Sequence, residues 1–380
     1  MKNIYEDDRI VMTLDAGGTN FVFTAFQAGR EIIKPINLPS YSDNLEACLK
    51  IIINGFNQVK KSLKGQKPEA ISFAFPGPAD YKNGVIGNLV NLPAFNGGVA
   101  LGPMLEEIFE IPTLINNDGD LFAYGEAVAG ILPFLNKKMA AAGLVRTYKN
   151  LIGITLGTGF GGGLVINNQI CLGDNSAAGE VWLTRNYIEP QTVVEESVSI
   201  RAIQRVYAKH SQSNDLLTPL EIYSIATGEK EGDQQAAILA FEEMGVAIGE
   251  SLANILALFD GQIVIGGGIA GASQFIIPKI IEHLSGSIYD LDNNAMPRTI
   301  ATIHNIDTDS GLQDFLKNSE TEVVIPFSTK KAFYSQEKRI AIAVSKLGTS
   351  TAICLGAYAL ALDFLDKTNM YSELIPSQID

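Results

Sequence analysis

Metal-binding and redox-active side chains are scarce in this sequence of 380 residues. Three cysteines, Cys48, Cys171 and Cys354, and three histidines are spread widely along the chain. An odd number of dispersed cysteines does not build a disulfide framework, and neither residue type clusters at the spacing of metal ligands. We therefore expect no disulfide and no zinc site.

Long hydrophobic runs are also lacking. The longest, "TAICLGAYALALDFL", is shorter than the ~20 apolar residues that a membrane span requires. The acidic start "MKNIYEDDRI" has no apolar core of the kind that defines a signal peptide. These absences predict a cytoplasmic protein with no membrane partner.

Basic residues are also few compared with acidic ones. The chain has 28 lysines and arginines against 42 aspartates and glutamates, and its net charge is −14. Nucleic-acid-binding proteins normally show a basic patch or stripe, so we expect no nucleic-acid partner. A nucleotide substrate is still compatible with this charge, because a few backbone amides and one metal ion suffice to hold its phosphates.

Apolar residues and glycine are abundant instead. A hydrophobic content of 46% and 36 glycines are typical of an α/β protein with many tight turns, and the length favours two domains. The strand-like segments "RIVMTLD" and "NFVFTAF" flank a glycine turn, and from residue 151 "LIGITLG" and "GGGLVINNQICLG" repeat this arrangement. The recurrence predicts a duplicated α/β unit.

The remaining segments alternate between strand and helix patterns. Further strands are expected at "REIIKPINLP", "AISFAFP", "IPTLIN" and "QIVIGGG". Helical patterns cover 44–63, 101–110, 119–132, much of 192–259, and about 349–367. Asp118 or Gly119 is expected near the N-cap of the third helix. Residues 133–150 and 305–322 have the character of insertions.

The first glycine turn, "LDAGGTN", places Asp15 at the end of an apolar strand. Gly17 and Gly18 let the backbone approach a phosphate, and the hydroxyl of Thr19 can donate to it. Asp15 has the chemistry to hold Mg²⁺ through water, since this ion prefers oxygen ligands and keeps much of its hydration. A tight hairpin whose aspartate caps its own turn has the same pattern.

The second turn, "LGTGFGGG", contains more glycines than a hairpin needs, which suggests that its backbone approaches a ligand. It is neither a Walker A loop nor a dinucleotide fingerprint, because no Gly-Lys-Ser/Thr follows and the next element is a strand. A glycine-rich bulge is the alternative. A third cluster, "IVIGGGIAGA", joins a strand to a helix, where either an adenosine or close packing favours glycine.

Polar residues end a buried strand at "LINNDGD". A carboxylate there, Asp118, lies where ligands of α/β sheets usually bind, and it can accept a proton from a hydroxyl that attacks a phosphoryl group. Asn117 can orient the same hydroxyls. The alternative for Asp118 is helix capping. Glu180 and Glu195 can accept hydrogen bonds from sugar hydroxyls, whereas Glu196 is better explained as surface charge.

Taken in order, these motifs resemble the ROK family of sugar kinases and sugar-responsive repressors. The matching stretches are "LDAGGTN", "FAFPGPADYKNGVI", "INNDGDLFAYGE", "LGTGFGGGLVINNQI", "AAGE" and "IVIGGG". The resemblance implies the actin-like, hexokinase-like two-domain α/β fold with a cleft between the domains. It also implies a small domain of residues 1–117 with a C-terminal helix at about 350–380, a large domain of residues 118–349, and a homodimer.

The resemblance further assigns roles to individual residues. Asp118 matches the catalytic base, and Asn117, Glu180 and Glu195 match sugar-binding residues, with Asn91 near a sugar hydroxyl. The ATP-binding set comprises Asp15, Gly17, Gly18, Thr19, Gly157, Thr158, Gly159, Gly266, Gly267 and Gly268. Asp15 would also hold Mg²⁺ through water.

One departure from the family concerns zinc. Many ROK proteins follow "AAGE" with a histidine and then a zinc-binding cysteine loop, whereas this chain has Leu183 and "LTRNYIEPQTVV". Zinc is therefore not expected, and the segment 182–191 would support the loop by packing instead.

The resulting expectation is an ATP- and Mg²⁺-dependent kinase for the 6-hydroxyl of a hexose or N-acetylhexosamine. Glucose, mannose, N-acetylglucosamine and N-acetylmannosamine all remain open as substrates. A catalytically silent sugar-binding protein is the alternative that the missing histidine suggests. A repressor is disfavoured, because the short stretch before residue 11 leaves no room for a helix-turn-helix.

Overall fold

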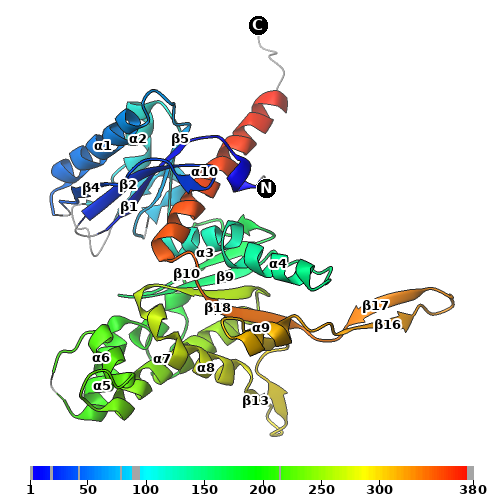
Figure 1. Cartoon of the computed structure of the whole chain (residues 1–380). Coiled ribbons are helices and arrows are strands. Elements are labelled where there is room, and N and C mark those ends of the chain that lie inside the picture. The colour runs from blue at the N-terminus through cyan, green and yellow to red at the C-terminus, as the bar shows by residue number, and fades with distance from the viewer. Residues whose placement is uncertain are drawn as a thin grey trace. The chain divides into compact units, whose positions relative to one another are not determined.

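In this computed structural model, which describes residues 3–17, 20–41, 43–77, 79–87, 95–213 and 215–374, the chain divides into two units. The first unit comprises Met1–Gly130, Gly163–Gly179 and Leu347–Asp380, and the second comprises Ile131–Gly162 and Glu180–Lys346. Each unit is built around its own sheet (Figure 1). No helix of the described part is long and apolar enough to cross a membrane.

The first unit has a mixed sheet in the order β3-β2-β1-β5-β8, with β4 also paired to β2. The strands of the first unit, which include three outside this sheet (β6, β7 and β11), are β1 Val11–Ala16, β2 Asn20–Gln27, β3 Arg30–Glu31, β4 Ile36–Pro39, β5 Ala70–Ala74, β6 Ala79–Asp80, β7 Val85–Ile86, β8 Thr113–Asn116 and β11 Gln169–Ile170. Its helices are α1 Leu45–Ser62, α2 Leu101–Phe109, α3 Asp118–Val128 and α10 Thr349–Leu374.

Residues of different size on the two faces of β5 allow helices to pack on both. Ile71 and Phe73 belong to the hydrophobic core that α1 and α2 share with the sheet, whereas the small Ala74 packs with Leu121 of α3 and Ala357 of α10. An ideal Cβ at Gly125 of α3 would lie 1.8 Å from a backbone oxygen of α10. Close packing of α3 on α10 therefore requires glycine there.

In the second unit, β9, β12, β18 and β15 form parallel pairs in that order. Figure 1 shows α5, α6, α7 and α8 gathered on one side of these strands. The strands are β9 Leu151–Leu156, β12 Gln262–Gly266, β13 Ser287–Tyr289, β14 Ala295–Pro297, β15 Thr302–Asn305, β16 Glu320–Val324, β17 Lys331–Ser335 and β18 Arg339–Val344, and β10 Phe160–Ile166 runs from this unit into the first. The helices are α4 Ile131–Ala141, α5 Ile200–Ser211, α6 Pro219–Ala226, α7 Gln234–Leu256, α8 Ser273–Leu284 and α9 Asp309–Phe315.

Several elements differ from the sequence expectation. The strand expected at "REIIKPINLP" is split into β3 and β4, with Pro35, which lacks an N–H donor, between them. The helix expected at 119–132 ends at Val128, and α4 starts at Ile131; an ideal Cβ at the intervening Gly130 would lie 2.1 Å from Glu126 Oε2. The last helix continues beyond residue 367 to Leu374.

The two segments with the character of insertions contain regular elements, and the first unit continues beyond residue 117. Residues 133–150 contain most of α4, and 305–322 contain α9, whereas the projecting element is the β16–β17 hairpin that follows (Figure 1). The first unit extends to Gly130, past residue 117, because α3 packs along α10.

Candidate active site

The junction between β8 and α3 presents Asp118. The N-cap of α3 is Asn117, whose Oδ1 accepts from the Gly119 N–H at 2.7 Å. Asp118 and Gly119, expected near the N-cap, are the first two residues of the helix, and the amide side chain of Asn117 performs the capping. Asp118 is the first residue of the helix and its side chain is exposed, although it also accepts from Gly119 N–H at 2.9 Å.

Asp15 lies near the end of β1, and Asp118 follows the end of β8 in the same sheet. Because β1 pairs in parallel with β5, and β5 with β8, the carboxyl ends of these strands share one edge. Ligands of α/β sheets usually bind at such an edge. The first unit thus places Asp15, Asn117 and Asp118 at one edge of its sheet.

The pKa values of Asp15 and Asp118 are both raised above the ordinary value of an aspartate. Surrounding protein reduces the hydration of Asp118 and raises its pKa, the charge of Asp15 acts in the same direction, and backbone N–H groups oppose them. Burial also raises the pKa of Asp15, while a hydrogen bond from Ser350 at the start of α10 lowers it. Sequence reasoning missed Ser350, because nothing in its local pattern points to the end of β1.

Asp15 suits a hydrated magnesium ion. Among the described residues, no three His, Cys, Asp or Glu side chains are arranged to hold a metal. Mg²⁺ needs no such cage, because it usually binds one or two carboxylates, substrate phosphates and water. The donor set of Asp15, with Asp118 near it, fits that chemistry.

The second unit contributes the other two glycine clusters. Gly267 has a φ of 88°, and an ideal Cβ on it would lie 2.1 Å from the Leu156 oxygen, so the end of β9 requires glycine at this position. This contact brings the Gly266–Gly268 cluster against the Gly157–Gly159 turn.

Gly157 and Gly268, unlike Gly267, have room for a side chain. An ideal Cβ on either glycine meets no described atom within 4 Å. Protein packing therefore does not require glycine at these two positions, and the open space leaves the backbone accessible to a ligand.

Glu195 lies directly against the Gly157–Gly159 turn. Its Oε2 accepts from the Phe160 N–H at 3.0 Å, and an ideal Cβ on Gly159 would lie 2.3 Å from the same oxygen. Glu195 Oε2 thus fixes the turn, while Oε1 of the same carboxylate lies 3.8 Å from Arg201. Neighbouring Glu196 pairs with Arg201 at 3.5 Å and Arg205 at 3.7 Å, in keeping with its interpretation as surface charge.

Glu180 has a partner that sequence reasoning missed. The indole Nε1–H of Trp182 donates to Glu180 Oε2. This contact orients the carboxylate from two residues away, whereas Leu183, at the position of the family's histidine, is exposed. The spacing in "GEVW" allows a hydrogen bond from Trp182 to Glu180, but a tryptophan two residues from a glutamate is more often interpreted as a packing residue.

The segment between Glu180 and Glu195 is held by Asn186, which is fully buried. Its Nδ2 donates to Thr192 Oγ1 at 3.0 Å and Ser197 Oγ at 2.9 Å, and its Oδ1 accepts from the Ile188 N–H at 3.0 Å. Hydrogen bonds therefore fix this loop from within.

Three of the expected site residues, Gly18, Thr19 and Asn91, lie outside the described residues. The others fall into two groups. The first unit holds Asp15, Gly17, Asn117 and Asp118, and the second holds Gly157, Thr158, Gly159, Glu180, Glu195, Gly266, Gly267 and Gly268.

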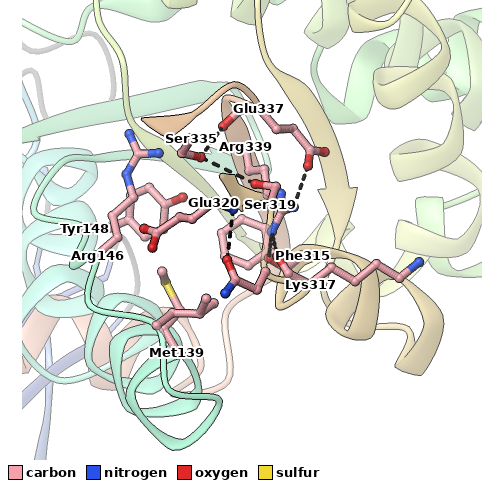
Figure 2. Close-up of a pocket in the computed structure, with 12 residues that line it drawn as sticks. Met139, Arg146, Tyr148, Phe315, Lys317, Ser319, Glu320, Ser335, Glu337 and Arg339 are labelled. Atoms are coloured by element: carbon pink, nitrogen blue, oxygen red, sulfur yellow. Dashed lines mark hydrogen bonds and ion pairs between the residues drawn. The ribbon is translucent and has the colours of Figure 1, made fainter. Parts of the chain in front are cut away.

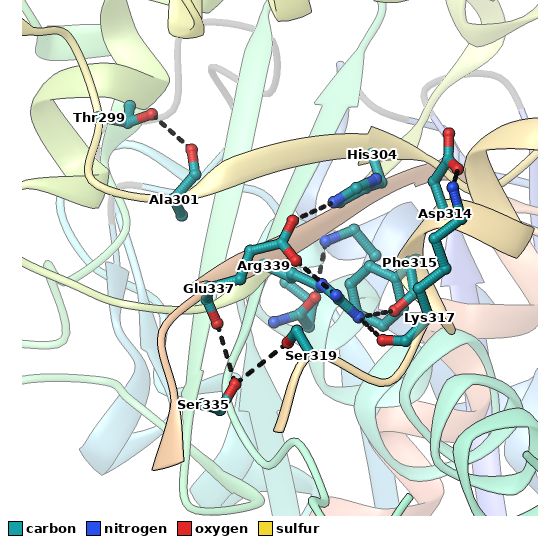
Figure 3. Close-up of polar contacts among 12 residues, drawn as sticks. Thr299, Ala301, His304, Asp314, Phe315, Lys317, Ser319, Ser335, Glu337 and Arg339 are labelled. Carbon is teal, nitrogen blue, oxygen red and sulfur yellow. Dashed lines mark hydrogen bonds and ion pairs between the residues drawn. The ribbon is translucent and has the colours of Figure 1, made fainter. Parts of the chain in front are cut away.

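A separate pocket in the second unit contains none of these residues. Figure 2 shows it between Arg146, Tyr148 and Arg339. Arg146 lies 5.3 Å from the Tyr148 ring centroid, and Arg339 donates to the Phe315 carbonyl at 2.8 Å. Figure 3 shows that Arg339 and its neighbours mainly join strands and loops to one another, which is a structural role.

The two sheets and the helices packed on them define an α/β protein. The ROK family model matches residues 11–311, and the chain belongs to the ROK family. It shares the actin-like two-domain α/β fold of its structural neighbours.

Individual relatives are sugar kinases by name. The chain is similar to the crystal structure of glucokinase from Parabacteroides distasonis, with 48% identity and a TM-score of 0.87, covering 96% of this chain and 99% of that one. It is 25% identical to a glucokinase of Halalkalibacterium halodurans, over 78% of this chain and 92% of the relative. It is 27% identical to an N-acetyl-D-glucosamine kinase of Photobacterium profundum, over 71% of this chain and 88% of the relative.

A fourth protein shares the fold at low identity. The ROK family glucokinase from Streptomyces griseus, solved in complex with glucose and AMPPNP, is 19% identical. The TM-score is 0.59, and the match covers 93% of this chain and 99% of that one.

Proposed function

We propose that the protein is an ATP-dependent kinase that phosphorylates the 6-hydroxyl of a hexose or N-acetylhexosamine. The observation that carries this proposal is Asp118, an accessible carboxylate at the carboxyl end of β8 that is not the helix cap and whose pKa is raised. A raised pKa brings a carboxylate closer to the range in which a general base is effective.

Asp118 takes the proton from the 6-hydroxyl as the sugar oxygen forms its bond to the γ-phosphorus of ATP. The bond from that phosphorus to the bridging oxygen breaks, and ADP leaves with the electron pair. Because such transition states are loose, orientation of the hydroxyl contributes much of the rate enhancement. Asn117 supplies orientation: its Oδ1 caps α3, which directs its Nδ2 donor to the sugar.

The glycine turns supply backbone donors for the phosphates. Gly157 and Gly268, where packing leaves a side chain room, let the nucleotide approach the main chain. Asp15 would hold Mg²⁺ through water, and this ion, when bound, would offset negative charge on the phosphates.

Glucose is the first substrate to test, since the relative with 48% identity is named a glucokinase and the Streptomyces griseus protein was solved with glucose. Glu180 and Glu195 accept hydrogen bonds from neighbouring sugar hydroxyls, with Trp182 orienting the former. We infer a homodimer from the family resemblance.

The experiment is coupled ADP release with Mg²⁺-ATP and glucose, mannose, N-acetylglucosamine or N-acetylmannosamine, with ³¹P NMR to locate the new phosphate. We expect sugar-dependent turnover with one preferred sugar and a 6-phosphate product. Binding of a sugar without turnover would instead support the silent sugar-binding protein, for which the exposed Leu183 in place of histidine is the relevant observation.

A further inference from the structure

Two short 3-10 turns of the second unit carry the carboxylates that are assigned to the sugar. Glu180 is the N-cap of the turn Val181–Leu183, and Glu195 lies within the turn Val194–Glu196. Neighbouring hydroxyls of one sugar reach both carboxylates only when the carboxylates are correctly spaced. The contacts that fix one turn relative to the other therefore decide how well the site fits a sugar.

Backbone contacts join the two turns. The Val194 N–H donates to the Thr184 carbonyl at 2.8 Å, and Arg185 and Val193 form an isolated antiparallel bridge. The segment 180–195 thus folds back on itself, with one carboxylate at each end. It contains neither cysteine nor histidine, the usual ligands of structural zinc, so hydrogen bonds and packing must hold its shape.

Asn186 closes this segment from within. In addition to the side-chain bonds described above, its backbone N–H donates to the Thr192 carbonyl at 3.1 Å. Both hydrogens of its Nδ2 are used, and the bond to Ser197 Oγ ties the segment to the residues that follow Glu195. A fully bonded, buried amide specifies one conformation, because any other leaves polar groups without partners.

Ser251 anchors the segment to α7. Its hydroxyl oxygen lies 2.9 Å from that of Thr184, and Thr184 Oγ1 donates in turn to the Val181 carbonyl at 2.8 Å. Because Thr184 gives its one hydroxyl proton to Val181, Ser251 is the donor in the first pair. The turn beside Glu180 is thereby tied to a helix of 23 residues.

Packing does not require a polar residue at Ser251. It is the only polar side chain among the buried residues of α7, a helix that the structure describes throughout. Serine in a helix commonly bonds to a carbonyl of its own preceding turn, whereas this hydroxyl bonds outward to Thr184. Alanine would occupy almost the same space and would favour the helix. The hydroxyl is therefore explained by its contact with the turn beside Glu180.

We propose that Ser251 and Asn186 are positioning residues for the sugar. Ser251 fixes the turn that follows Glu180, Asn186 fixes the segment that leads to Glu195, and together they set the spacing of the two carboxylates. The proposal rests on the proposed function, which assigns both carboxylates to the sugar. Neither positioning residue touches a reacting atom, so the effect falls on sugar binding and selectivity rather than on phosphate transfer or ATP.

The first experiment compares Ser251→Ala with the native protein in the coupled assay. KM for the preferred sugar should rise about five- to tenfold, the loss expected for one hydrogen bond, while kcat and KM for ATP stay within about twofold. Asn186→Ala should act in the same direction and more strongly, because it leaves several buried groups unpaired. The preference for one of the four sugars should weaken in both variants, because less firmly held carboxylates discriminate less.

Thr184 supplies the test of the hydroxyl pair itself. Thr184→Val removes the partner of Ser251 and should also raise KM for the sugar, whereas Thr184→Ser keeps the hydroxyl and should recover most of the lost affinity. The double variant Ser251→Ala with Thr184→Val should have a KM close to that of the more affected single variant, since both substitutions remove the same contact.

Ile248→Val is the matched control. Ile248 is buried in α7, less than one turn from Ser251, and shortening it should lower the unfolding temperature without breaking a hydrogen bond. KM for the sugar should be unchanged. A rise in KM that occurs in Ser251→Ala and not in Ile248→Val separates positioning from a general loss of stability.

Trp182 provides a measurement that needs no turnover. It is the only tryptophan of the chain and follows Glu180 by two residues, so quenching of its fluorescence by acrylamide reports on this turn. Ser251→Ala and Asn186→Ala should make Trp182 more accessible to the quencher, and Ile248→Val should not.

Two kinetic results would overturn the proposal: a native KM for the sugar in Ser251→Ala, or equal rises in Ser251→Ala and Ile248→Val. Unchanged Trp182 quenching in both Ser251→Ala and Asn186→Ala would overturn it as well, even in a protein that turns over no sugar. Absence of turnover in the native protein, with altered quenching in these variants, would instead refute the kinase function while supporting the hydrogen-bonded segment.

Discussion

The turns after β1 and β9 have similar sequences, but their leading glycines are required for different reasons. An ideal Cβ on Gly17 would lie 2.8 Å from the Asn20 backbone oxygen, so the hairpin itself excludes a side chain. An ideal Cβ on Gly157 meets no described atom within 4 Å. A glycine that packing does not require is the better indicator of a ligand, and the structure separates the two cases where the sequence could not.

The carboxylates beside the two turns come from different parts of the sequence. Asp15 lies in β1 just before the first turn, and burial raises its pKa. The second turn has no acid of its own, and Glu195 approaches it from a distant loop to accept from Phe160 N–H. We therefore propose proton and metal chemistry for the first unit and phosphate contacts by backbone amides for the second.

Asp118→Asn should have the largest effect. Loss of a general base lowers kcat by about 10²–10⁴-fold, while KM for the sugar changes little, because the amide keeps the size of the side chain. Coupled ADP release and calorimetric sugar binding on the same preparation measure both quantities. Equal loss of binding and turnover would instead point to a role in holding the sugar.

Gly267→Ala and Gly157→Ala should separate packing from ligand contact. At Gly267 the positive φ and the Leu156 oxygen leave no room, so the substitution should destabilise the fold by about 1–3 kcal/mol. Gly157→Ala should leave thermal unfolding unchanged and raise KM for ATP on the order of tenfold, as the methyl group hinders phosphate approach. Similar thermal shifts for the two variants would contradict the distinction.

Trp182→Phe should have a smaller effect, confined to the sugar. Removal of the indole donor frees the Glu180 carboxylate, and KM for the sugar should rise about three- to tenfold with kcat nearly unchanged. Tyr187→Phe, in the same loop, is the matched control and should resemble the native enzyme. A change in KM for ATP rather than for the sugar would argue against this role of Trp182.

The smallest effect should be the change in unfolding temperature that Asp118→Asn causes. Because the folded-state pKa of Asp118 is raised above its ordinary value of 3.8, the folded protein binds the proton more tightly, and ionisation costs stability as pH rises through the folded-state pKa. Neutral Asp118→Asn should therefore unfold at a slightly higher temperature at pH 7. The difference should narrow as pH falls towards 3.8. A lower unfolding temperature at pH 7 would contradict the raised pKa.

Much of the fold was predictable because its signals are local. The glycine turns and strand patterns predicted β1, β2, β9 and β12 within a few residues, whereas the strand expected at "GGGLVINNQICLG" is divided into β10 and β11. The break between α3 and α4 was missed, since an apolar pattern continues through Ala129 and Gly130. The projecting hairpin was missed because its exposed Val324 and Phe333 resemble ordinary strand residues in sequence.

The candidate site was predictable only in part. Asp118 and the glycines stand in recognisable motifs, but the partners that orient them do not. Ser350 and Trp182 reach Asp15 and Glu180 through side-chain geometry, and the capping role of Asn117 depends on backbone angles. Such contacts depend on tertiary structure and leave little trace in local sequence.

The most direct test of Asp118 as the base is the pH dependence of kcat/KM for the preferred sugar, in the native enzyme and in the residual activity of Asp118→Asn. The account predicts that native activity falls on the acid side through a single ionisation with an apparent pKa above 3.8, the ordinary carboxyl value, and that the variant lacks this acid limb. An acid limb that persists unchanged in Asp118→Asn would show that another group accepts the proton.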